Sequence, residues 1–421
     1  MKAWKLSIWI WILITILAVG GRYIEQLDTV LFAPCQYVED EVLFANDSID
    51  SAIDSVVEAD SAVSIQPRYP IYEGLNHRPN LTQLMSGADT AQVRVVHYGD
   101  SQIEEDRITV TLRRHLQALY GGGGVGLVPL HQTIPTRTLR QHVWINDRLQ
   151  TTSQGPKRYL IYGPKIMRRD TNLYGPMGQV AVLNDSLVPG SEHLVWQAEP
   201  MAVKPFSEKY FNQIHIWGTH DSIIRVADST TTYTLTFDGA QDVYGISLET
   251  NCGVMVDNIP MRGCSGYIFT SIQQEQLVRY FSVTNTRLII LQFGGNMISH
   301  MQSEAGASAY ASEMRRHVEY LKRCAPEAAL LFIGPSDMLT LQDGEWVSHP
   351  MVPVVDSYLH RMADAAGISY WSLYQAMGGE GSMLHWQEIG WTGDDGIHFT
   401  RSGADKAAEM LWEWLTQKDE E

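Results

Sequence analysis

A short β-branched run followed by a Gly-Asp-Ser turn is the feature of this 421-residue chain that most constrains its fold. Residues 93–96 predict a strand, and Gly99, Asp100 and Ser101 follow it as a turn. From residue 103 to residue 119 the apolar residues take helical spacing. A serine between a strand and a helix is exposed near the positive end of the helix dipole, which suits a nucleophile. The alternative is that Asp100 and Ser101 only cap the helix.

The second half of the chain alternates between apolar strand candidates and helical segments. Such alternation predicts an α/β domain whose parallel sheet is covered by helices on both faces. We expect this domain to be discontinuous and to comprise residues 91–138 and 254–417. Its expected later strands lie at 254–259, 287–296, 329–337 and 368–374, and its expected later helices lie at 307–324, 354–366 and 401–417.

Residues 139–253 predict an inserted β-rich module. Short alternating runs recur between turn residues without a convincing helical pattern, which is typical of a β-sandwich or jelly roll. Its aromatic residues form either a sugar-stacking face, as in a carbohydrate-binding module, or part of a core, and we favour the core. The preceding glycine-rich run, residues 121–129, follows a helix rather than a strand, so we expect a flexible loop beside the site, not a dinucleotide site. The strand candidates are 158–163, 179–184, 193–199, 213–218, 223–228, 232–239 and 243–249.

The first 21 residues predict a targeting segment, because Lys2 and Lys5 precede an uncharged apolar run. The run falls short of the roughly 20 residues that span a bilayer comfortably. Two alternatives stay open, a cleaved signal peptide and an N-terminal anchor, and either predicts an exported protein. Residues 22–90 predict a largely irregular acidic tether, since residues 23–67 contain ten acidic residues and no Lys or Arg.

Charge and cysteine content limit the classes of partner and cofactor. The net charge of −17 argues against a nucleic-acid partner, because nothing would offset phosphate repulsion. The four cysteines lack metal-site spacing, and the sequence leaves open a Cys252–Cys264 bridge or buried thiols. The remaining histidines have no spacing that indicates a metal. We therefore expect neither a cofactor nor a metal.

Four motifs follow the strand candidates or precede the last helix, where open α/β sheets carry their functional loops. In this order they resemble the SGNH (GDSL) hydrolase family, whose named Ser, Gly, Asn and His would be Ser101, Gly263, Asn296 and His398. The resemblance implies a three-layer, flavodoxin-like α/β fold with a parallel sheet, here with the β-module inserted. No G-x-S-x-G elbow occurs in the sequence, which argues against the standard α/β-hydrolase alternative.

The chemistry of acyl transfer fits the same residues. It needs a hydroxyl nucleophile, a base and a carboxylate that orients the base, and we predict Ser101, His398 and Asp395 for these roles. The family's oxyanion donors would be the Gly263 N–H, the Asn296 side chain and the Ser101 N–H. Two lesser alternatives stay open: Gly266 in place of Gly263, and Asp394 in place of Asp395.

The export signal, the β-insertion and the absence of a long apolar lid favour a polar substrate. The layout resembles the peptidoglycan O-acetylesterase branch, and one segment resembles exported proteins of Gram-negative bacteria, which implies a periplasmic location. Our first hypothesis is therefore a serine esterase that removes O-acetyl groups from a cell-envelope glycan. The second is an O-acetyltransferase of the same fold, working with an inner-membrane acyltransferase partner. The third is a glycan-binding protein with a vestigial site.

Overall fold

The computed structural model describes nine stretches of the chain between residues 78 and 417. The predicted targeting segment and most of the predicted tether lie outside the described residues. Among the described residues, no helix is both long enough and apolar enough to cross a membrane. The described stretches are 78–145, 148–150, 156–169, 171, 173–183, 193–200, 211–230, 232–238 and 240–417.

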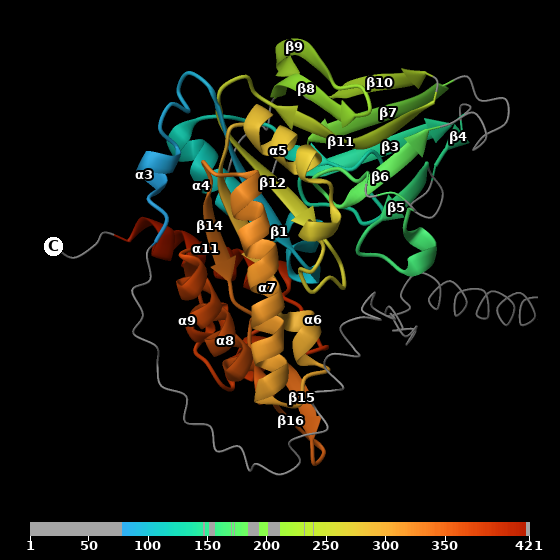
Figure 1. Cartoon of the computed structure of the whole chain (residues 1–421). Helices are drawn as coiled ribbons and strands as arrows, with labels where there is room; N and C mark the ends of the chain where they lie inside the picture. Colours follow the sequence, from blue (N-terminus) through green and yellow to red (C-terminus); the bar gives the residue numbers. More distant parts are fainter. Residues whose placement is uncertain are drawn as a thin grey trace, which may run out of the picture. The chain divides into compact units, whose positions relative to one another are not determined.

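A five-stranded parallel sheet forms the centre of the α/β part (Figure 1). Every neighbouring pair in it runs parallel, and the strands are almost wholly buried, as the continuous apolar runs predict. The predicted fold class, a parallel sheet with an inserted β-module, is confirmed. In spatial order the strands are β12 (Gly253–Pro260), β1 (Gln92–Gly99), β13 (Thr286–Gln292), β14 (Ala329–Ile333) and β17 (Ser369–Trp371).

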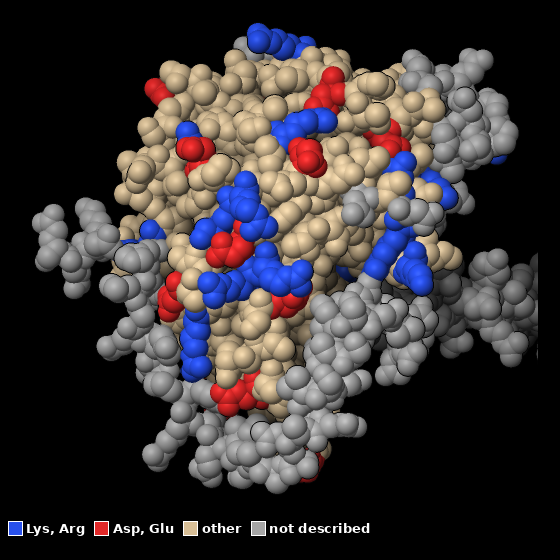
Figure 2. Space-filling view, viewed as in Figure 1, with Lys and Arg blue, Asp and Glu red and all other residues tan. Residues whose placement is uncertain are grey.

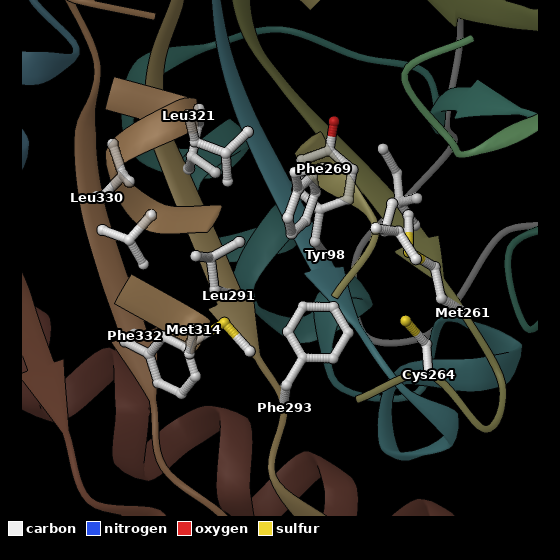
Figure 3. Packing of buried hydrophobic residues seen from close by; sticks show 14 of the residues in the cluster. Tyr98, Met261, Cys264, Phe269, Leu291, Phe293, Met314, Leu321, Leu330 and Phe332 are labelled. Carbon is white, nitrogen blue, oxygen red and sulfur yellow. The ribbon is translucent and has the colours of Figure 1, made fainter. Parts of the chain in front are cut away.

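Helices cover both faces of this sheet, because successive residues of each strand point to opposite sides. Ile289 and Leu291 enter one core, while Leu288 and Ile290 enter the other. Figure 3 shows the first core, where Leu291 of β13 and Phe332 of β14 lie near Met314 of α7 (Glu304–Cys324), and Tyr98 of β1 packs against Phe269. The first core is covered by α5 (Gln274–Val283), α7 (Glu304–Cys324) and α8 (Met351–Ala366); the second is covered by α4 (Thr109–Tyr120), α9 (Leu373–Met377), α10 (Ser382–Glu388) and α11 (Arg401–Thr416).

The surface over α7 carries a mixture of charges. Figure 2 shows Lys and Arg side chains gathered there with Asp or Glu side chains among them. Two of the contacts are ion pairs within the helix, Arg316–Glu313 at 2.7 Å and Lys322–Glu319 at 3.9 Å. The acidic neighbours therefore offset part of the positive charge of this face.

The segment after Ser101 differs from its prediction as one continuous helix. It forms a 3₁₀ segment, η1 (Ser101–Asp106), and α4 begins only at Thr109. Glu105 and Asp106 have φ values of 60° and 61°, and no right-handed helix passes through two such residues. Leu119, expected on the buried face, is 60% exposed. The helix-dipole argument for Ser101 is correspondingly wrong, because the long helix starts eight positions later.

Other elements also depart from the sequence-based expectations. The predicted strand 368–374 ends at Trp371, because the Ser372 side chain accepts a hydrogen bond from the Gln375 N–H and caps α9. A hairpin of β15 (Leu339–Gln342) and β16 (Glu345–Ser348), and helix α5, were not predicted. Shorter elements are α3 (Leu81–Leu84), α6 (Gly295–Ile298), η2 (Lys165–Met167) and η3 (Phe269–Ser271).

The insertion is a sandwich of two antiparallel sheets that share one core. The seven predicted strands are all present, while two further strands, Leu139–Ile145 and Arg148–Leu149, were not predicted. Trp196 and Trp217 are buried, which confirms the core interpretation for these two aromatics. One sheet has the order β10 (Tyr233–Asp238), β7 (His193–Pro200), β3 (Leu139–Ile145), β4 (Arg148–Leu149); the other has β5 (Lys157–Leu160), β6 (Gln179–Leu183), β11 (Gln241–Glu249), β8 (Phe211–Gly218), β9 (Ser222–Thr230), with β2 (Gly126–Val128) also on β11.

The glycine-rich run 121–129 is not a loop beside the site, so that prediction is wrong. A Cβ at Gly122 would stand 2.5 Å from the Val254 carbonyl oxygen, at the amino end of β12. Helix α4 leaves the carboxyl end of β1 and returns antiparallel to it, so its last residue reaches the opposite end of the sheet from Ser101. There the run packs closely, and β2 within it pairs with β11. Its glycines serve close backbone packing.

A buried ionic cluster joins the insertion to the parallel sheet. Arg94 of β1 contacts Glu249 of β11 and lies 2.6 Å from Asp257 of β12. All three side chains are at most 1% exposed. Tyr280 of α5 donates a hydrogen bond to Asp257, and its ring lies 4.8 Å from that of Trp217 of β8. The two parts therefore share charged and aromatic contacts.

Candidate active site

The predicted motifs meet at the carboxyl edge of the parallel sheet. Backbone hydrogen bonds tie the strand ends together there, from the Met261 N–H to the Gly99 carbonyl at 2.7 Å and from the Asp100 N–H to the Gln292 carbonyl at 3.3 Å. Ser101 follows β1, Gly263 follows β12, and the Asn296 motif follows β13. Parallel strands present their carboxyl ends at one edge, so three segments distant in sequence become neighbours.

Ser101, His398 and Asp395 form a continuous chain of hydrogen bonds. Ser101 Oγ lies 2.8 Å from His398 Nε2, and His398 Nδ1 lies 2.7 Å from Asp395 Oδ2. The serine is 9% exposed, and the histidine side chain is 23% exposed. The exposed neighbour Asp394 makes no described contact with His398. The structure thus brings together the three side chains that were predicted as nucleophile, base and orienting carboxylate.

Asp395 is fixed by both of its carboxylate oxygens. While Oδ2 faces the His398 ring, Oδ1 accepts hydrogen bonds from the backbone N–H groups of Ile397 at 3.0 Å and of His398 at 2.9 Å. Burial alone would raise the pKa of Asp395, but these hydrogen bonds outweigh it and lower the pKa to about 2. The carboxylate is therefore ionised at neutral pH and held in one orientation toward the imidazole.

Gln102 positions the histidine loop and was not singled out from the sequence. Its amide nitrogen donates to the Ile397 carbonyl at 2.6 Å, and its amide oxygen accepts from the Phe399 N–H at 3.4 Å. These two bonds clamp the residues on either side of His398 to the residue that follows Ser101. A glutamine in this place has no local pattern that would reveal it, because both partners lie about 295 residues later in the chain.

Gly263 lies in the turn after β12 and adopts a left-handed backbone, with φ at +73°. A Cβ built on it would meet no atom within 4 Å, so crowding by the protein does not require glycine there, whereas the backbone conformation favours it. At the alternative position, Gly266, a Cβ would stand 2.4 Å from Met314 Cε, in the core shown in Figure 3. Close packing thus accounts for Gly266.

Asn296 bridges the serine and glycine motifs. Its amide nitrogen donates to Asp100 Oδ2 at 3.1 Å and to the Cys264 carbonyl at 3.2 Å. Burial raises the pKa of Asp100 to about 6, against the opposing effect of the Gln102 N–H and of His398. Both amide hydrogens of Asn296 therefore have partners in this state, although both bonds are long.

An ion pair beside Gly263 was also not predicted from the sequence. Arg262, next to Gly263, lies 3.0 Å from Glu104 of η1. The Glu104 side chain is 7% exposed, and the Arg262 side chain is 58% exposed. The kink in η1 turns Glu104 inward, so the pair depends on a backbone conformation that hydrophobic periodicity does not show.

Three described cysteines, Cys252, Cys264 and Cys324, are free thiols, which excludes the Cys252–Cys264 bridge in this structure.

Residues 221–406 match the family model of the GDSL-like lipase/acylhydrolase family. The match includes Gly263, Asn296, Asp395 and His398 and begins after Ser101, which the fold places at the same edge. The chain therefore carries a GDSL-like lipase/acylhydrolase domain of the SGNH type. It is accordingly an ester-bond hydrolase by family.

Solved structures agree with the SGNH fold of this chain. A structure described as a peptidoglycan O-acetylesterase in action has a TM-score of 0.61 at 20% identity and covers 80% of this chain and 93% of its own. A carbohydrate acetylesterase from Sinorhizobium meliloti has 11% identity and a TM-score of 0.28, with 38% of this chain and 78% of its own covered. That score is too low to add to the argument. No curated protein sequence matches this SGNH hydrolase.

Proposed function

We propose that this SGNH hydrolase is an exported serine esterase that removes O-acetyl groups from a cell-envelope glycan. The observation that carries the proposal is the hydrogen-bonded chain from Ser101 Oγ through His398 to Asp395. A hydroxyl in contact with an imidazole that is itself oriented by a carboxylate is the arrangement that acyl transfer through a serine requires.

The proposed reaction proceeds in two halves. His398 Nε2 accepts the Ser101 proton while Oγ attacks the acetyl carbonyl carbon, and the imidazolium then protonates the departing sugar oxygen. Water enters, gives a proton to His398 Nε2 and attacks the acetyl carbonyl carbon, and the imidazolium then returns that proton to Ser101 Oγ as acetate leaves. Asp395 holds Nδ1–H and stabilises the imidazolium in both halves.

The oxyanion would be held by the N–H groups of Gly263 and Ser101 and by the Asn296 amide. Asn296 reaches the oxyanion by redirecting one of its two long hydrogen bonds, to Asp100 or to the Cys264 carbonyl. Catalytic hydrogen bonds often tighten only in the bound complex. Each such donor typically contributes on the order of 3 kcal/mol to transition-state stabilisation.

The substrate class rests on three further supports. The similar structure that covers most of this chain is described as a peptidoglycan O-acetylesterase. The inserted β-sandwich is joined firmly to the catalytic part, so it can hold a long substrate in a constant position. The N-terminal apolar run predicts export. The resemblance of one segment to exported proteins of Gram-negative bacteria implies the periplasm, where an envelope glycan is available.

The test measures acetate release from O-acetylated peptidoglycan by the full chain, with and without a soluble sugar acceptor. Wild type releases acetate whether or not the acceptor is present, and Ser101→Ala lowers the rate roughly 10⁴-fold or more. Ser282→Ala, a change in a surface position of α5, serves as the matched control and keeps the wild-type rate.

Two results would count against the proposal. Accumulation of acetyl groups on the acceptor, with little free acetate, would favour the second hypothesis, an acetyltransferase that works with a membrane partner, over the esterase. Acetate release that is the same in Ser101→Ala as in wild type, or absent with every ester, would favour the glycan-binding alternative and overturn the serine mechanism.

A further inference from the structure

The β15–β16 hairpin extends from the carboxyl edge of the parallel sheet, next to the candidate active site. Figure 1 shows it projecting past the ends of α7 and α8. Its antiparallel register places Leu339 opposite Ser348 and Leu341 opposite Trp346. The hairpin follows β14, the fourth strand in the spatial order of the sheet, and so leaves from the same edge that holds Ser101.

The base of the hairpin is bound to the loop that carries Asp395 and His398. The Leu339 N–H donates to the Gly396 carbonyl at 2.9 Å, and a Cβ at Gly396 would stand 2.8 Å from Leu339 Cβ. On the other strand, Ser348 Oγ donates to Asp337 at 2.7 Å and accepts from the Gly381 N–H at 2.7 Å. The hairpin is thus fixed at its base rather than hinged there.

The free part of the hairpin presents an apolar pair on the same face. Side chains alternate along a strand, so Leu341 lies on the face of Leu339, and its cross-strand partner Trp346 shares that face. Leu339 is 5% exposed against the catalytic loop, whereas Leu341 is 60% and Trp346 is 50% exposed. Two residues along a strand span roughly 7 Å, so the pair continues the surface of the catalytic loop outward.

The surroundings of the pair favour a sugar over a lipid. The tip of the hairpin carries Asp343 in the turn and Glu345 at the start of β16, both exposed, and their negative charge opposes contact with anionic headgroups. An indole offers a large apolar plane on which the C–H face of a pyranose can lie.

We propose that Leu341 and Trp346 form a platform that binds a sugar ring of the glycan chain whose ester occupies the Ser101 site. This inference rests on the proposed function and adds a subsite to it, one that lies outside the inserted β-module. The platform is continuous with the catalytic loop, so a ring held there keeps the chain in register with Ser101.

The first experiment compares kcat/KM on O-acetylated peptidoglycan with kcat/KM on 4-nitrophenyl acetate, which is too small to reach the platform. Trp346→Ala lowers the ratio of the two about tenfold, through a higher KM for the polymer, as expected for the loss of an exposed aromatic anchor. Trp346→Phe restores most of the ratio, because a smaller aromatic plane remains. Leu119→Ala is the exposure-matched control at the far end of α4, and it leaves the ratio unchanged.

A second experiment separates failure of this inference from failure of the proposed function. Full-length Ser101→Ala is sedimented with insoluble de-O-acetylated peptidoglycan, with and without Trp346→Ala. Weaker cosedimentation of the double variant supports the platform even where wild type releases no acetate. Equal cosedimentation, an unchanged ratio in the first experiment, or an equal loss on both esters would overturn it. So would a change from dimer to monomer in Trp346→Ala, which would identify the pair as a contact between copies.

Discussion

Asp395 uses both of its carboxylate oxygens, because one contacts the His398 imidazole and the other accepts hydrogen bonds from the backbone of the loop. Asp395→Asn keeps the size of the side chain but removes the charge and offers an N–H where an acceptor is needed. We expect kcat on an acetyl ester to fall about 10⁴-fold, since the amide favours the wrong tautomer of His398. The measurement is the steady-state rate on 4-nitrophenyl acetate at neutral pH.

The control for this prediction is Asp394→Asn, an exposed carboxylate next to it in sequence, which is expected to keep the wild-type rate. Equal losses in the two variants would contradict the assignment of Asp395.

The pKa of Asp395, about 2, also predicts how the rate depends on pH. The Asp395 carboxylate stays ionised as pH falls to about 4, and loses its charge only as pH approaches 2. An acid limb of the wild-type rate profile above pH 4 must therefore come from another group.

At the scale of single residues, sequence reasoning located the serine, aspartate and histidine that the fold brings into contact. No single local pattern was sufficient, and the order of the four motifs, which resembles that of the family, identified them. The contacts of Gln102, and the two bonds of Asn296 to Asp100 and Cys264, could not be read in the same way. They join residues that are distant in sequence, and neither glutamine nor asparagine has a local pattern that identifies its partner.

At the scale of elements, the kinked segment η1 depends on a buried ion pair. Arg113 of α4 binds Asp106, the last residue of η1, and Thr138 donates a hydrogen bond to the same carboxylate at 2.6 Å. Asp106→Ala leaves the Arg113 guanidinium buried without its counter-charge. We expect the free energy of unfolding to fall by about 3–5 kcal/mol, measured by urea denaturation, and the esterase rate to fall as Ser101 loses its fixed position.

Glu199→Ala is the matched control for the ion pair. It removes the carboxylate from Arg140, and both side chains of that pair are at least half exposed. A surface pair of this kind contributes at most about 1 kcal/mol. If Asp106→Ala costs no more than this control, the buried pair does not hold the kink.

Periodicity predicted most strands and long helices but missed the elements with broken or short patterns. Strand β3 carries Gln141 and His142 in its middle, which interrupts the alternation of apolar residues. The β15–β16 hairpin has only four residues in each strand and exposes its apolar pair. The helix expected after Ser101 failed for a different reason, since hydrophobic spacing carries no information about the positive φ values at Glu105 and Asp106.

At the scale of the whole molecule, the insertion shares a buried ionic cluster with the α/β part of the chain. Glu249 lies on the insertion's β11, while its partner Arg94 lies on the central strand that leads to Ser101. Burial alone would raise the pKa of Glu249, yet the Arg94 charge lowers it below its usual value. The sequence predicted an insertion in the α/β domain, but the pairing of charges across the junction follows only from the folded arrangement.

This coupling predicts that the two parts unfold together. Calorimetry of wild type should give one transition, because neither part can separate without exposing the Arg94 cluster and the Trp217–Tyr280 contact. Arg94→Met fills similar volume but leaves Glu249 and Asp257 buried without their cation, which should cost about 3–5 kcal/mol of unfolding free energy. Arg287→Met, at a pair in which both side chains are at least one-third exposed, should change it by less than about 1 kcal/mol. Two separate transitions in wild type would show that the insertion unfolds independently of the α/β part. The Arg94 cluster would then join the two parts without making their unfolding cooperative.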